Sequence, residues 1–107
     1  MWKGASIIEF LPREQVLNSL QEPFQSYLDK YGIDDIGIFE EEGQDQHCYM
    51  GYTVKKAGKA YHVHSPFLKD GNGGLSPETN EWTIESDEPE GADRSGFTSI
   101  EQALQEL

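Results

Sequence analysis

The sequence predicts an α+β domain, a two-layer sandwich in which a four-stranded antiparallel meander is covered by an N-terminal and a C-terminal helix. Two observations support this prediction. Apolar residues follow a helical period near each end of the chain, and apolar and polar residues alternate in four segments between them. The expected element order is α-β-β-β-β-α. The chain has 107 residues, which is the size of one ordinary domain, so residues 1–107 are interpreted as a single α+β domain.

The first helix is expected to begin at Pro12, because proline is favoured at the first helical position. Its apolar face follows helical spacing and consists of Val16, Leu17, Leu20, Phe24, Tyr27, Leu28 and Tyr31. Pro23 lies inside this pattern and predicts a kink or break near residues 20–22. Gly32 follows the last apolar residue and predicts a left-handed cap at the end of the helix.

Four strands are expected after this helix, at residues 33–41, 46–55, 59–65 and 79–86. Successive side chains of a strand point to opposite faces, so each strand has an apolar and a polar side. The apolar side consists of Ile36, Ile38, Cys48, Met50, Tyr52, Val54, Tyr61, Val63, Trp82 and Ile84. We expect both helices to cover this face and to leave the opposite face open to solvent.

The pairing of the second and third strands follows from a two-residue turn at Ala57 and Gly58. This turn places Val54 opposite Tyr61, and it brings the apolar residues of both strands to one face. The resulting hairpin has one face suited to burial.

The first hairpin needs a loop of odd length, because an even loop would mix the two faces. A loop around residues 43–45 predicts that Ile38 pairs with Met50 and Phe39 with Tyr49.

The rest of the chain is expected to consist of two long polar loops and one helix. The loops are residues 66–77 and 87–96. Thr98 is the predicted N-cap of the last helix, with Glu101 closing a capping box. The apolar stripe of this helix consists of Ile100, Ala103, Leu104 and Leu107.

The charge of the chain limits its partners. Twenty acidic residues against eight basic ones give a net charge of −12. Direct binding to nucleic acid or to an anionic membrane is disfavoured, because both need basic residues. The acidity serves solubility in the simplest interpretation, and it also favours a basic protein as partner. The single Cys48 and the N-terminus, which does not resemble a signal peptide, predict a cytoplasmic protein. Cys48 itself is interpreted as a small buried residue.

The open face of the sheet is the candidate functional surface. Its expected residues are Phe39, Tyr49, Thr53, His62, His64, Glu81, Thr83 and Glu85. In a metal site, His62 and His64 would project from the same side of one strand and bind a divalent ion together with Glu81 or Glu85. In the second interpretation, the two imidazoles pair with these carboxylates across the strands. In the third, Phe39, Tyr49, Thr53 and Thr83 form an interaction surface, for a partner or for a homodimer.

Four segments resemble a known group of proteins. They are YGIDDIGIFEEE at residues 31–42, YMGYTV at 49–54, YHVHSP at 61–66 and EWTIE at 81–85. Together they are similar to a family of small, uncharacterised single-domain proteins of Gram-positive bacteria. The resemblance implies a bacterial origin, and it implies no activity or functional residue because the function of that family is unknown.

The sequence therefore favours a non-enzymatic acidic module for binding or regulation, which acts through protein contacts. No catalytic residue and no cofactor is assigned. The alternative is a metal-binding protein or metal-dependent enzyme that uses the His-x-His pair of the open face.

Overall fold

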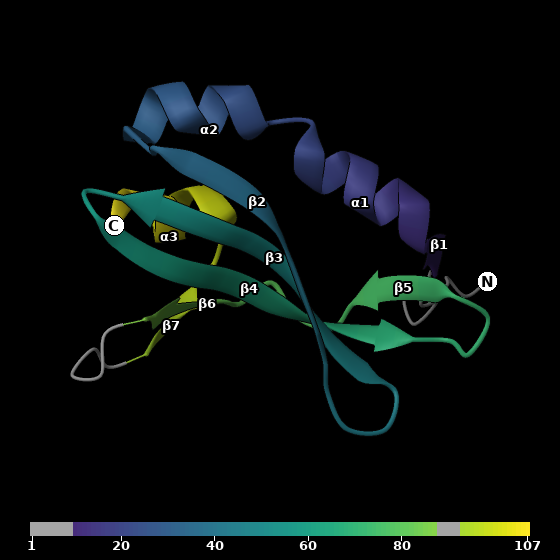
Figure 1. Ribbon diagram of the computed structural model, residues 1–107. Helices are drawn as coiled ribbons and strands as arrows, with labels where there is room; N and C mark the ends of the chain where they lie inside the picture. The colour runs from purple at the N-terminus through teal and green to yellow at the C-terminus, as the bar shows by residue number, and fades with distance from the viewer. Residues whose placement is uncertain (1–9, 88–92) are drawn as a thin grey trace, which may run out of the picture.

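A long hairpin formed by β3 (His47–Lys56) and β4 (Lys59–Lys69) lies in the middle of the molecule, with the helices packed beside it (Figure 1). The computed structural model describes residues 10–87 and 93–107. The other strands are β1 (Leu11–Pro12), β2 (Asp35–Glu42), β5 (Gly74–Pro77), β6 (Trp82–Ser86) and β7 (Arg94–Phe97). The helices are α1 (Arg13–Gln21), α2 (Phe24–Tyr31) and α3 (Ile100–Gln105). The chain is thus an α+β fold with one antiparallel sheet, as predicted.

The predicted four-strand meander is wrong in its details. The sheet runs in the order β1-β5-β4-β3-β2, and β6 pairs with β4 while β7 pairs with β6. The end of β4 and all of β5 occupy residues that the sequence predicts to be loop. Residues 88–92 of the second predicted loop lie outside the described residues, and residues 94–96 of it belong to β7. Strands as short as β5 and β7 have no room for the alternation that reveals a longer strand.

Strand β4 changes its neighbour part-way along its length. Tyr61 to His64 pair with β6, and Phe67 to Lys69 pair with β5. Pro66 lies at the change, where its carbonyl accepts a hydrogen bond of 3.0 Å from the Glu78 N–H. The N–H and C=O of a strand residue point to the same side, so the N–H that Pro66 lacks would face Glu78. Proline cannot return the hydrogen bond, and the β4–β5 pairing ends beside it, at Phe67 and Pro77.

The register of the central hairpin is confirmed. Val54 pairs with Tyr61 and Thr53 with His62 across the turn. Both turn residues have positive φ, 54° at Ala57 and 78° at Gly58, as the tight primed turns of hairpins require.

The predicted register of the first hairpin is wrong by two residues. Ile38 pairs with Tyr52, not with Met50. The loop is centred on Asp45, which takes a left-handed φ of 57°, and the Gly43 N–H donates to the His47 carbonyl at 3.0 Å. Aspartate tolerates this conformation better than most residues, so the turn forms one residue later than predicted. A shift of two residues keeps every side chain on its predicted face.

The hydrophobic core lies between the predicted apolar face and the helices. Below α1 it contains Val16, Cys48, Met50, Phe67 and Leu75. Below α2 and α3 it contains Tyr27, Tyr31, Ile33, Tyr52, Val54, Val63, Ile84, Ala103 and Leu104. The Tyr27 hydroxyl donates a hydrogen bond of 2.7 Å to Glu101 and so joins α2 to α3. Helices therefore cover this face of the sheet, as the sequence predicts.

The helix ends follow their sequence signals with two exceptions, each of one residue. The first helix begins at Arg13 and not at Pro12, which is its N-cap residue. The predicted break at Pro23 separates α1 from α2, and Gly32 caps α2 with a φ of 64°. The predicted N-cap Thr98 is wrong by one residue, because the Ser99 side chain accepts the hydrogen bond from the Gln102 N–H. None of the helices in the described part of the chain has the length and apolar character needed to span a membrane.

Candidate functional site

The open face is centred on an aromatic side chain that lies across a glycine. Phe39 of β2 pairs with Gly51 of β3, and Gly51 pairs with His64 of β4. Because Gly51 has no side chain, the Phe39 ring reaches over it to β4. There it stacks on His62 with ring centroids 4.4 Å apart and on His64 with centroids 5.3 Å apart. Three strands thus contribute to one packed aromatic cluster on this face.

His64 is the most constrained residue of the cluster. Its Nε2 atom lies 2.5 Å from a carboxylate oxygen of Glu85, and its side chain is 12% exposed. Tyr49 packs against it edge to face, with centroids 5.4 Å apart. Its Nδ1 atom is buried and has no hydrogen-bond partner among the described residues. The expected pairing of an imidazole with a carboxylate across the strands is confirmed for His64 and Glu85.

The four residues predicted to bind a metal are divided between different contacts. His64 pairs with Glu85, His62 stacks on Phe39, and Glu81 lies exposed just before β6 begins. In the described residues, no group of three or more His, Cys, Asp or Glu side chains is arranged to hold a metal ion. A metal site formed by His62, His64, Glu81 and Glu85 stays a prediction.

A groove of about 840 Å³ extends the open face past the ends of the strands. Its floor includes Tyr49, His64 and Thr83. Carboxylates stand around it on two sides, Glu42 and Asp45 at the β2–β3 loop and Glu78 and Glu81 between β5 and β6. We call this feature the acidic groove. His47 and Pro66 also line it, and His47 Nε2 lies 3.5 Å from Glu78.

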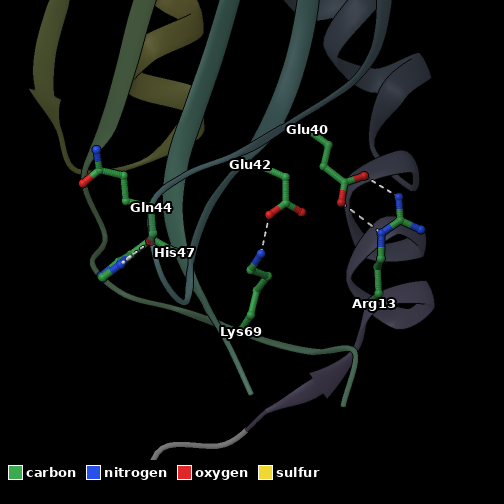
Figure 2. A network of polar contacts seen from close by, with 6 residues as sticks. All are labelled: Arg13, Glu40, Glu42, Gln44, His47 and Lys69. Carbon is green, nitrogen blue, oxygen red and sulfur yellow. Dashed lines mark hydrogen bonds and ion pairs between the residues drawn. The ribbon is translucent and has the colours of Figure 1, made fainter. Parts of the chain in front are cut away.

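A second hollow, the charged cleft, lies beside α1 and contains two ion pairs (Figure 2). Arg13 of α1 binds Glu40 of β2 through both carboxylate oxygens, and Lys69 at the end of β4 binds Glu42. The hydrogen bond from Arg13 holds the pKa of Glu40 below its ordinary value. Each basic side chain of this cleft is thus already matched by a carboxylate.

Cys48 lines the charged cleft, but it does not have the environment of a nucleophile. It is 2% exposed, and burial raises the pKa of its thiol. Reactive cysteines have a lowered pKa and access to solvent. The structure thus agrees with the interpretation of Cys48 as a buried structural residue.

The turn that closes this cleft is organised by one carboxylate. Asp70 accepts hydrogen bonds from the backbone N–H groups of Asn72 and Gly74, at 2.7 and 2.9 Å. These bonds lower the pKa of Asp70. They also occupy backbone N–H groups that an anion would otherwise use, so this glycine-rich turn is unsuited to phosphate.

Replacing Glu40 by glutamine is expected to lower the free energy of unfolding by about 0.5 kcal/mol near neutral pH, the scale of an exposed ion pair. The folded-state pKa of Glu40 is depressed below 4.5, so the stabilisation is fully present above that ordinary value. It is lost as the pH falls through the lower folded-state value. Urea unfolding at several pH values measures this difference, with Glu41→Gln on the same strand as the control. A difference that persists in acid would show that Glu40 contributes packing instead of charge.

The two ion pairs of the charged cleft were not predicted from the sequence. Glu40 and Glu42 were not among the candidate residues, although the alternation places both on the side that the helices cover. This position on the covered side of the strand was the one indication in the sequence that Glu40 and Glu42 have partners. The partner of Glu40 lies 27 residues away, and only the packing of α1 on the sheet brings the two together.

The comparisons with known proteins agree with the resemblance of the strand segments. A family model described as "Family of unknown function (DUF5634)" matches residues 10–107. The chain belongs to this family. The match spans every strand and helix of the structure, so the aromatic cluster and both hollows lie inside the DUF5634 region. No curated protein matches the chain.

Proposed function

We propose that this DUF5634 chain is a non-enzymatic binding or regulatory module that acts through protein contacts, and that its acidic groove receives a basic segment of a partner protein. The supporting observation is the composition of the groove. Four carboxylates stand around an aromatic floor, and the described lining residues include no lysine or arginine. With a net charge of −12 on the chain, the field at this groove attracts cations and steers a basic partner to it.

The surroundings of the groove also resemble a protein interface. Binding surfaces commonly combine a central aromatic anchor with a polar rim. Here the cluster of Phe39, Tyr49 and His64 forms the centre, and exposed acids form the rim. Thr53 and Thr83 belong to the same open face and extend it along β3 and β6.

The charged cleft is a weaker candidate for the same role. Its carboxylates Glu40 and Glu42 are already bound by Arg13 and Lys69. A basic ligand would have to displace these cations. Asp45 lines both the cleft and the groove, but the acidic groove also contains Glu81, whose carboxylate has no ion-pair partner among the described residues.

Removing two groove charges is expected to weaken binding of a basic peptide. The probe is a short fluorescent peptide of alternating lysine and arginine, measured by anisotropy at low salt. The variant Glu78→Gln with Glu81→Gln should raise Kd about tenfold, which corresponds to about 1.4 kcal/mol shared between two charges. The matched control is Glu22→Gln with Asp29→Asn, which changes the net charge equally at the end of α1 and in α2.

Two outcomes would contradict the proposal. Equal weakening by both double variants would mean that the peptide responds to net charge and not to the groove. No saturable binding to the unchanged protein would remove the proposal altogether. A homodimer through the open face is a separate prediction, and sedimentation velocity of the free protein tests it independently.

A further inference from the structure

We infer that the acidic groove selects arginine over lysine in its partner, an inference that rests on the proposed function. The argument concerns the ring of Tyr49 and what holds it in place. Tyr49 lies on the groove floor between His64 of β4 and Gly43 of the β2–β3 loop. A Cβ atom at Gly43 would lie 3.3 Å from the edge of the Tyr49 ring. The edge of the ring therefore lies close to the loop at Gly43, where an added side chain would crowd it.

His64 provides a rigid wall on the other side of Tyr49. Its ring plane is inclined by 25° to that of Phe39 and is fixed by the contact to Glu85. Tyr49 meets it at an interplanar angle of 66°. Because these rings are held by their neighbours, little side-chain entropy is lost when a ligand packs against them.

Free carboxylates lie beside this aromatic floor. Glu42 is engaged by Lys69 and Glu78 lies near His47, whereas the Glu81 and Asp45 carboxylates have no ion-pair partner among the described residues. A ligand cation in the groove therefore meets an aromatic surface and an available carboxylate at once.

A guanidinium group suits this combination better than an ammonium group does. It is planar, so it stacks on an aromatic ring, and its N–H groups form paired hydrogen bonds with a carboxylate. The ammonium of lysine is compact, strongly hydrated and without a plane to stack. The same positive charge should therefore bind more tightly when arginine carries it.

The test compares three peptides that differ only in their cationic residue, which is arginine, lysine or the neutral planar analogue citrulline. We expect the arginine peptide to bind about fivefold or more tightly than the lysine peptide, and the citrulline peptide to bind weakest. Tyr49→Leu should remove the difference between arginine and lysine while changing the lysine affinity less than about twofold. Tyr49→Phe keeps the ring and should keep the preference.

The outcomes separate this inference from the proposed function. Equal affinity for the arginine and lysine peptides, with binding still reduced by Glu78→Gln and Glu81→Gln, overturns the inference alone. Binding of neither peptide overturns both. A preference that persists in Tyr49→Leu, with its fold verified by circular dichroism, also overturns the inference, because it places the selectivity outside the aromatic floor.

Discussion

Replacing Gly51 by alanine is expected to lower the free energy of unfolding by about 3 kcal/mol, at the upper end of the cost of overpacking. A Cβ atom at this position would lie 2.0 Å from the Val63 carbonyl oxygen and 2.7 Å from the His64 Cα atom. Both are backbone atoms of the neighbouring strand, so no side-chain rotation relieves the clash. Strands β3 and β4 would have to separate at the centre of the sheet. A domain of this size has a total stability of about 5–15 kcal/mol, so the loss is a large fraction of it.

The matched control for this variant is Gly37→Ala on β2. Its Cβ atom would lie 3.1 Å from the Thr53 hydroxyl oxygen, which belongs to a side chain that can rotate away. We expect a change below about 1 kcal/mol there. Denaturant unfolding measures both values, and the ring-current shifts of the His62 and His64 protons report whether Phe39 still stacks on them. A Gly51→Ala protein as stable as the control would mean that β3 and β4 lie farther apart than described.

The alternation of side chains was sufficient to predict the open face. Phe39, Tyr49, His62 and His64 lie on it because each strand has a period of two, whatever its exact register. The turn at Ala57 and Gly58 also specified its own register, since a tight two-residue turn leaves the chain few alternatives. Local signals of this kind need no knowledge of distant residues.

The acidic groove and the extra strands could not be predicted in the same way. Glu78 and Glu81 reach the groove only because β4 exchanges β6 for β5 at Pro66, a choice that depends on packing along the whole strand. The loop at Asp45 shifted the first hairpin by two residues without any change in the face pattern. The alternation of apolar and polar residues cannot reveal such a shift, because a shift of two residues leaves every side chain on the same face of the sheet.

Tyr52 connects the two regions of the structure that the sequence predicts separately, the helices and the sheet. It is 2% exposed, and its ring lies near three others, those of Phe24, Tyr27 and Trp82, with centroids 5.8–6.4 Å away. Its hydroxyl donates a hydrogen bond of 2.8 Å to the Leu20 carbonyl. That carbonyl is in the last turn of α1, where helix carbonyls lack intrahelical partners. A residue of the sheet therefore stabilises the end of α1, just before Pro23 interrupts the helix.

Tyr52→Ala is expected to lower the free energy of unfolding by about 4 kcal/mol, within the range for removing a large aromatic ring from a core. Tyr52→Phe keeps the ring contacts and loses only the hydrogen bond, so it should cost about 1 kcal/mol. The difference between the free energies of unfolding of the two variants gives the contribution of the ring without that of the hydroxyl. Denaturant unfolding of both proteins measures it. If Tyr52→Phe costs as much as Tyr52→Ala, the hydroxyl contact to α1 outweighs the whole aromatic packing. If neither variant loses stability, α1 and α2 are not held to the sheet through Tyr52, and the other core residues stabilise the covered face.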